Sequence, residues 1–244
     1  MVALRLLLTN QQNRPVDSFL VGQEQPESSE FHFVFLKEGK EMKLTDRDIE
    51  ILRFINDFGF CTTPHLMNFI SVRQWRIYQI MNRLVRRGLV KKEFGFQGHP
   101  LIYYLTDEGA SFTDLPAIDA VSFGVYLHQV AMVNVALKLM RLYPEATWVS
   151  ERHLKYDKFI DGVGVRGHIA DGLLLFPDAK RVAIEVELSV KGKRRLDGIL
   201  KSYSAQFDIK EIWYFCSPKA YSSLTGLVGK KTYIKLFTLK EFLA

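Results

Sequence analysis

Three short segments between residues 45 and 87 place apolar residues three and four positions apart, which is the spacing of an amphipathic helix. They span about 45–58, 62–70 and 72–87, and a glycine follows the first and the third as a helix stop. We expect the third helix to bury these apolar residues: Val72, Trp75, Tyr78, Ile80, Met81, Leu84 and Val85. The pattern predicts a small three-helix unit.

Two short strands follow at about 89–94 and 101–105, joined by a turn that contains glycine and proline. Three short helices and a β-hairpin are the elements of a winged helix-turn-helix domain, which we expect over residues 44–115. Within residues 1–43, the segment 10–30 is rich in Gln, Asn, Ser, Pro and Glu, and FHFVFL after it alternates weakly. We expect an N-terminal arm with one short strand there.

The rest of the chain, residues 116–244, mixes helical and strand patterns. Helices are expected at about 126–142 and 193–205, and strands at about 146–150, 168–175, 182–188, 212–216 and 232–236. Strands interleaved with helices predict a second domain of the α+β or α/β class, with helices packed on a sheet.

Composition narrows the class of protein. The 33 Lys and Arg residues outnumber the 27 Asp and Glu residues, and the net charge of +6 suits a polyanionic partner. The two cysteines are far apart in the sequence, which argues against a disulfide scaffold or a thiolate zinc site and fits a cytoplasmic protein. We expect no membrane insertion, because we see no apolar run near the length that spans a bilayer.

Every charged residue from Arg73 to Lys92 is basic. In a winged helix the third helix enters the major groove of DNA, so these residues are candidates for DNA contact. We expect Arg73, Gln74, Arg76 and Arg83 to contact DNA from the helix, and Lys91 and Lys92 to contact phosphates. The alternative is a solvated helix face, which is the commoner role of a charge run.

A carboxylate cluster is expected in the second domain. With a period of two, Glu185, Glu187 and Lys191 share one face of their strand, opposite the apolar residues. A hairpin brings Asp171 of the preceding strand beside Glu185. Oxygen ligands on neighbouring strands suit Mg²⁺ or Mn²⁺, and the alternative is an ion-pair network with nearby basic residues.

This pattern resembles the PD-(D/E)xK nuclease superfamily, a restriction-endonuclease-like fold. The resemblance implies that Asp171 and Glu185 are metal ligands and that a lysine assists the attacking water. Glu187 stands where that lysine is expected, and Lys191 on the same side is the candidate replacement. The resemblance therefore implies either a catalytic site formed by Asp171, Glu185, Glu187 and Lys191 or a degenerate, non-cutting one.

A winged helix followed by HIAD and EVELSVKGKRR is similar to the plasmid replication-relaxation and mobilisation protein family. That resemblance implies a partner duplex at a transfer or replication origin, other mobilisation or replication proteins, and nicking of DNA. The alternative is a non-catalytic DNA-binding accessory or regulatory protein. No heptad pattern indicates a dimer helix, and the oligomeric state stays open.

A second basic surface is expected on the helix after the acidic strand, where Lys193, Arg194 and Arg195 are candidates for DNA contact. Tyr203 on the same helix is expected to pack, as helical tyrosines commonly do. His128 is a candidate for lining the carboxylate site, and His168 for shaping it or contacting phosphate.

Overall fold

The computed structural model describes residues 31–35, 41–94, 98–160, 168–190, 192–206, 208–229 and 231–242. Most of the predicted N-terminal arm, residues 1–30, lies outside this part, and so does Lys191. The described chain starts with a hairpin in which β1 (Phe31–Phe35) pairs antiparallel with β2 (Glu41–Thr45). The predicted short strand is β1.

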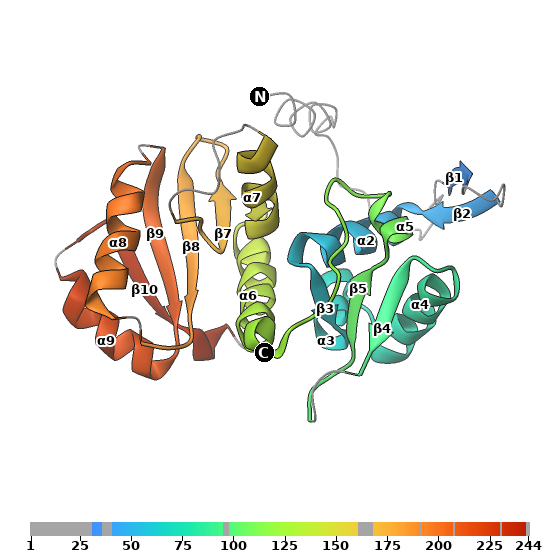
Figure 1. Ribbon diagram of the computed structural model, residues 1–244, viewed down its shortest axis with the longest axis horizontal. Helices are drawn as coiled ribbons and strands as arrows, with labels where there is room; N and C mark the ends of the chain where they lie inside the picture. Colours follow the sequence, from blue (N-terminus) through green and yellow to red (C-terminus); the bar gives the residue numbers. More distant parts are fainter. Residues whose placement is uncertain are drawn as a thin grey trace, which may run out of the picture.

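The first unit, on the right of Figure 1, contains three longer helices, the short helix α5 and a small sheet. Its elements are α2 (Asp46–Phe58), β3 (Phe60–Thr62), α3 (Thr63–Ile70), α4 (Gln74–Arg86), β4 (Val90–Glu93), β5 (Ile102–Leu105) and α5 (Asp107–Ala110). The sheet is antiparallel in the order β3-β5-β4. The predicted three helices and hairpin are confirmed, and β3 is a strand that the sequence pattern did not indicate.

The start of α2 is fixed by a reciprocal cap. The Thr45 side chain accepts from the Asp48 backbone N–H at 3.2 Å, and the Asp48 carboxylate accepts from the Thr45 N–H at 3.1 Å. This capping box satisfies two backbone donors that the helix leaves open. The Asp48 side chain is also fully buried, so its carboxylate requires a partner within the protein.

The hairpin formed by β4 and β5 is here called the wing. It is closed by residues 106–110 (TDEGA), which contain Thr106 and the short helix α5. The Thr106 hydroxyl donates to the Gly88 carbonyl at 2.6 Å, and its oxygen accepts from the Gly109 N–H at 3.0 Å. A Cβ at Gly109 would lie 1.9 Å from the Leu89 carbonyl oxygen, so only glycine permits this close approach.

The second unit contains a five-stranded mixed sheet in the order β10-β9-β8-β7-β6. Its elements are α6 (Phe123–Leu142), β6 (Thr147–Ser150), α7 (Glu151–Ile160), β7 (Gly172–Leu175), β8 (Arg181–Glu187), α8 (Lys193–Ser204), β9 (Ile209–Cys216), α9 (Pro218–Val228), β10 (Ile234–Thr238) and the 3-10 turn η1 (Leu239–Glu241). Strands β6, β7 and β8 are antiparallel, whereas β8, β9 and β10 are parallel. The predicted strands and two helices are confirmed, and α7 and α9 were not predicted.

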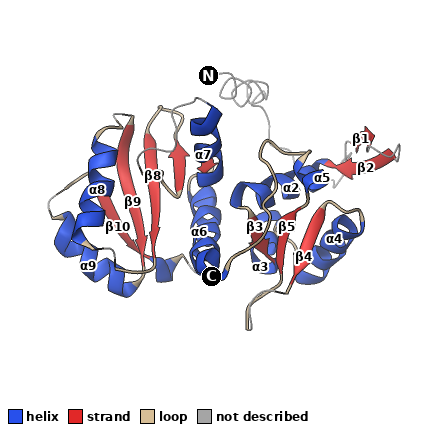
Figure 2. Ribbon diagram, in the orientation of Figure 1, coloured by secondary structure: helices blue, strands red, loops and turns tan. Residues whose placement is uncertain are grey.

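Helices cover both faces of this sheet. Figure 2 shows α6 between the sheet and the first unit, with α8 and α9 on the other side. Val182, Ile184 and Val186 of β8 belong to the core that α6 shares with the first unit, whereas Ala183 packs in the core under α8 and α9. The two units therefore share one continuous apolar core through α6.

Helix α6, with 20 residues, is long and apolar enough to span a membrane by length and composition alone, and an 18-residue stretch of it has a mean hydropathy of 1.3. The sequence-based statement that no apolar run approaches that length was therefore wrong. In the structure, Ala131, Val133, Val135 and Ala136 of this helix are buried in the shared core. A buried core helix passes the same composition test.

Trp75 is a correction to the predicted core. It is 59% exposed, and Ile77 is buried in its place. The reason is the helical phase: Ile77, Ile80, Met81 and Leu84 follow the spacing of one buried face, and Trp75 lies two positions before that face. The indole therefore projects from the solvent side of α4.

Candidate functional site

One surface of the first unit is basic and is here called the α4 surface. It consists of these exposed residues of α4, its N-cap and β4: Arg73, Gln74, Trp75, Arg76, Gln79, Asn82, Arg86, Lys91 and Lys92. Several of the polar side chains are held by one another. Gln74 donates to Tyr78 Oη at 2.9 Å, and Arg76 donates to Gln79 Oε1 at 3.0 Å. The structure thus places five of the six predicted α4 and wing contact residues on one surface.

Arg83 has a different role from its predicted one. Its guanidinium donates to the carboxylate of Asp48, the buried third residue of α2 and a member of its capping box, and the Arg83 side chain is 38% exposed. A buried carboxylate needs such a partner, because an unpaired buried charge is costly. We therefore assign Arg83 first to holding α4 against α2, while its contact with DNA stays a prediction.

The predicted carboxylate cluster forms in the second unit. Gly172 of β7 pairs with Ile184 of β8, so Asp171, just before β7, lies beside Glu185. Glu185 and Glu187 are 1% and 4% exposed, and both lie on the α8 side of the sheet as the alternation predicted. Burial raises the pKa of Glu185, and the negative charge of the neighbouring Asp171 raises it further. Lys191, the fourth predicted catalytic residue, lies outside the described residues.

Asp171 is held by the backbone of β8 and by His128 of α6. Its Oδ2 accepts from the Val186 N–H at 2.7 Å and lies 3.2 Å from His128 Nε2. The same Nε2 lies 3.1 Å from the Val186 carbonyl oxygen. A carbonyl only accepts, so Nε2 carries the proton and donates to both oxygens. This hydrogen bond to Asp171 raises the pKa of His128. The prediction that His128 lines the carboxylate site is consistent with these contacts.

Glu185 is held by His168, a predicted candidate for shaping the site, and by Tyr203, which was expected only to pack. Its Oε1 accepts from the Tyr203 hydroxyl of α8 and lies 2.5 Å from His168 Nε2. Burial raises the pKa of Glu185, and these two hydrogen bonds oppose the increase. Burial and the charge of Glu185 also raise the pKa of Tyr203, so its hydroxyl stays protonated. Tyr203 is buried, as expected, but it also positions a carboxylate.

Tyr214 of β9 is a residue that sequence reasoning missed. It pairs in register with Glu185, is fully buried, and its hydroxyl has no hydrogen-bond partner among the described residues. Burial raises its pKa, and the charges of Glu185 and Glu187 raise it further. The alternation of IKEIWYFC placed Tyr214 on the same face as the acidic residues of β8, and that signal was available. Neither Tyr203 nor Tyr214 is poised as a phenolate nucleophile.

The carboxylates as arranged do not fit a hydrated Mg²⁺ ion. Mg²⁺ keeps several waters in near-octahedral geometry, whereas Glu185 is enclosed and its Oε1 already accepts two hydrogen bonds. Within the described ranges no group of three or more His, Cys, Asp or Glu side chains is placed to hold a metal ion. Oε1 of Glu185 is therefore not open to Mg²⁺ or Mn²⁺ while His168 and Tyr203 hold it, and binding of either ion at Asp171 and Glu185 stays a prediction.

Replacing Tyr203 with phenylalanine is expected to lower the free energy of unfolding by about 1–3 kcal/mol, because the buried Glu185 loses a hydrogen-bond donor. Tyr214→Phe is the matched control: it removes a buried hydroxyl that has no hydrogen-bond partner in the described chain, so stability should not fall and can rise by up to about 1–3 kcal/mol. Urea unfolding of both variants measures the difference. Equal losses would show that Tyr203 does not support Glu185.

The predicted second basic surface lies on α8. Arg194 and Arg195 are exposed in its first turn, which has no acidic residue, and Lys193 is its first residue. Figure 1 shows α8 and α4 toward opposite ends of the long axis, with the sheet and α6 between them. The two basic surfaces therefore do not form one continuous surface, and the contact of Lys193, Arg194 and Arg195 with DNA stays a prediction.

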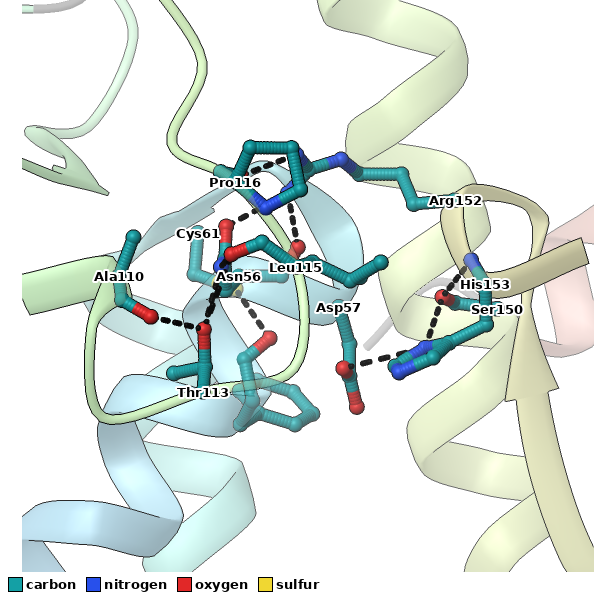
Figure 3. Close-up of polar contacts among 11 residues, drawn as sticks. Asn56, Asp57, Cys61, Ala110, Thr113, Leu115, Pro116, Ser150, Arg152 and His153 are labelled. Atoms are coloured by element: carbon teal, nitrogen blue, oxygen red, sulfur yellow. Dashed lines mark hydrogen bonds and ion pairs between the residues drawn. The ribbon is translucent and has the colours of Figure 1, made fainter. Parts of the chain in front are cut away.

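The two units meet at a polar junction, which Figure 3 shows in close-up. Arg152 of α7 reaches α2: its Nη1 donates to the backbone carbonyl of Asn56 and, at 2.6 Å, to Asn56 Oδ1. Its Nη2 donates to the Pro116 carbonyl at 2.7 Å. Asn56, which is fully buried, donates from Nδ2 to Thr113 Oγ1 and the Leu115 carbonyl. The linker between the units is thus tied to both.

A small cavity of about 20 Å³ opens at this junction. It is lined by Asp57, Phe58, His128, Gln129, Met132, Ser150, Glu151, Arg152 and Asp171. Its size suits about one water molecule. Since α2, α6 and α7 all contribute to its wall, the cavity connects the carboxylate site with the first unit.

Asp57 of α2 lines this cavity, and the pKa of its carboxyl group is raised. Burial raises its pKa to about 7, the charge of Asp114 adds to the increase, and the charges of Arg152 and Arg53 oppose it. His153 Nδ1 lies 3.4 Å from its Oδ1, and burial lowers the pKa of that histidine. Two groups with opposite shifts therefore face each other across the junction (Figure 3).

The Asp57→Asn variant is expected to match the wild type in unfolding free energy near pH 4 and to exceed it near pH 8. The folded-state pKa of Asp57 lies above its unfolded value, so the stability it contributes is present at low pH and is lost as pH rises through about 7. His153 titrates in both proteins, so the difference isolates Asp57. Urea unfolding at pH 4, 6 and 8 measures it, and a difference that does not change with pH contradicts the assignment.

No protein-family model matches the sequence, and no curated protein matches it either. Among solved structures, the oxidized form of MarR from E. coli is 18% identical, with 49% of this chain and 75% of that chain covered and a TM-score of 0.26. A mutant MarR complexed with operator DNA is 19% identical, with 50% and 76% covered and a TM-score of 0.27. Human N-acetylserotonin methyltransferase in complex with SAM is 11% identical, with 79% and 61% covered and a TM-score of 0.21. TM-scores this low carry no argument about the fold or function of this chain.

Proposed function

We propose that this protein is a cytoplasmic duplex-DNA-binding protein that places α4 in the major groove and the wing against the backbone. The observation that carries the proposal is the charge of the α4 surface: from Arg73 to Lys92 every charged residue is basic, and Arg73, Arg76, Arg86, Lys91 and Lys92 are exposed. Such a surface matches a regular array of phosphates. The arrangement of α3, α4 and the wing supports the proposal, because a winged helix presents its third helix in this way.

Two features favour DNA contact over a merely solvated helix. Lys92 reaches back from β4 to Asn82 Oδ1 of α4 at 3.3 Å, so the basic side chains of helix and wing belong to one surface. Arg83 is held by Asp48, which positions α4 firmly on α2. A rigid element presents its contact residues with less entropic cost on binding.

Fluorescence anisotropy with a labelled duplex of random sequence tests the proposal. We expect binding whose affinity falls steeply between about 50 and 200 mM salt, as counterion release requires. Selection from a pool of duplexes with a randomised centre then shows whether binding is sequence-specific. Absence of binding at about 50 mM salt, or binding that salt does not weaken, would refute the proposal.

A metal-dependent nickase of the plasmid mobilisation type is the second candidate function. It is favoured by the register of β7 and β8, which brings Asp171 beside Glu185 on strands of a mixed sheet, as the PD-(D/E)xK resemblance implies. A transfer or replication origin would then be the partner duplex, with other mobilisation or replication proteins assembled on it. The enclosed state of Glu185 argues for the non-catalytic accessory role.

Conversion of supercoiled plasmid to open circles with Mg²⁺ or Mn²⁺ separates the two roles. Asp171→Ala and Glu185→Ala proteins, checked for folding by thermal unfolding, serve as controls. Nicking by the wild type alone would establish the nickase. No nicking, together with salt-sensitive DNA binding that both variants retain, would leave the accessory role and make the second unit a scaffold.

A further inference from the structure

The α4 surface contains a large apolar side chain that DNA phosphates do not explain. Trp75 is 59% exposed, whereas Trp148 and Trp213 pack in the core of the protein. An exposed tryptophan inside a basic surface leaves apolar area in contact with water, which favours a partner that covers it.

The place of Trp75 in the helix indicates what covers it. Trp75 is the second residue of α4, and Gln79, Asn82 and Arg86 continue its exposed stripe at helical spacing. In helix-turn-helix proteins the first residues of the recognition helix are those that contact base edges. In a duplex complex of the proposed kind, this position would place the indole at the depth of the bases.

The polar residues around Trp75 are partly engaged with one another. Gln74 donates to Tyr78, Arg76 donates to Gln79, and Lys92 donates to Asn82. These bonds hold the amides and cations beside the indole, which leaves the ring as the main apolar feature near the start of α4. In the major groove, the apolar feature that distinguishes one base from the others is the 5-methyl group of thymine.

We propose that Trp75 packs against a thymine methyl group in the major groove and so makes the protein prefer thymine at one position of its site. This inference rests on the proposed duplex-DNA binding and adds to it the base that one residue reads. A protein partner is the other possible cover for an exposed indole. The basic residues on both sides, Arg73, Arg76 and Arg86, favour the polyanion.

Uracil substitution tests the proposal, because uracil differs from thymine only in lacking the 5-methyl group. A duplex is first selected by the wild-type protein from a randomised pool. It is then synthesised in a series in which one thymine at a time is replaced by uracil. Wild-type affinity, measured by anisotropy, is expected to fall about fourfold at the position that Trp75 contacts, the worth of one buried methyl group. Trp75→Ala is expected to bind the two duplexes equally well.

The control variant is Phe123→Ala, which removes a comparably exposed aromatic ring, 58% exposed, from α6. It is expected to keep the fourfold preference for thymine. Trp75→Ala is expected to unfold at the wild-type temperature, since its side chain is largely exposed, and thermal unfolding verifies this.

The outcomes separate this inference from the proposed function. If the wild type binds no duplex even at about 50 mM salt, DNA binding itself fails. If the wild type binds DNA but does not distinguish thymine from uracil at any position, or if Trp75→Ala keeps the same preference, the inference is overturned and DNA binding stands. A Trp75→Ala protein with unchanged DNA binding and altered self-association would assign the indole to a protein contact, which also overturns it.

Discussion

Replacing Arg86, Lys91 and Lys92 together with glutamine is expected to weaken binding to duplex DNA about a thousandfold at roughly 50 mM salt. All three side chains are exposed on the α4 surface, and Lys92 is anchored to α4 through Asn82. Each phosphate contact contributes about 0.9 to the slope of log affinity against log salt concentration, so the slope should fall by about three. Anisotropy titrations between about 50 and 200 mM salt measure both quantities.

The control for this triple variant keeps the same change in net charge at a different place. Lys219, Lys231 and Lys240 are exposed on the second unit, and their joint replacement with glutamine also removes three positive charges. We expect this control to keep the wild-type salt slope within about one, because long-range attraction is screened at these salt concentrations. If both triple variants lose affinity equally, net charge and not the α4 surface governs binding.

Local patterns predicted much of the first unit. The cap at Thr45, the apolar spacing in three segments and the wing all follow from the sequence between near neighbours. Trp75 was assigned to the core as one of the apolar residues of the third helix, although its spacing from Ile77 and Leu84 places it on the opposite face of α4. The partnership of Arg83 with Asp48 joins residues 35 positions apart, and no local pattern indicates it.

The carboxylate site was also predicted in part from local sequence patterns. Alternation along β8 and the short hairpin from β7 were sufficient to place Asp171, Glu185 and Glu187 together. The contacts of Glu185 with His168 and Tyr203 depend on how α8 packs on the sheet, and that packing is tertiary. The sequence therefore indicated the acidic residues and His168 as a candidate beside them, but not the contact of Tyr203 with Glu185.

The two missed helices show a second limit. Helix α9 does carry a start signal, since Ser217 accepts from the Ala220 N–H at 3.3 Å and Pro218 occupies the first turn. Helix α7 begins directly after β6 and is mostly polar, so its pattern is weak. Yet α7 supplies Arg152, which ties the second unit to the first.

Arg152→Ala is expected to lower the free energy of unfolding by about 2–4 kcal/mol, the second large effect that the structure predicts. The guanidinium makes hydrogen bonds to the Asn56 backbone carbonyl, to Asn56 Oδ1 and to the Pro116 carbonyl (Figure 3). Without it, a fully buried amide oxygen loses its charged donor, and an unsatisfied buried acceptor is costly. Urea unfolding followed by circular dichroism measures the loss.

Arg181→Ala is the control. Arg181 donates to the side chain of Asp208, and both side chains are substantially exposed, at 39% and 52%. An exposed pair contributes at most about 1 kcal/mol, so this variant should unfold close to the wild type. A double-mutant cycle of Arg152→Ala with Asn56→Ala should give a coupling energy of about 1–3 kcal/mol. Additive losses in that cycle would show that the two side chains stabilise the protein independently, with Arg152 acting through the Asn56 and Pro116 backbone carbonyls.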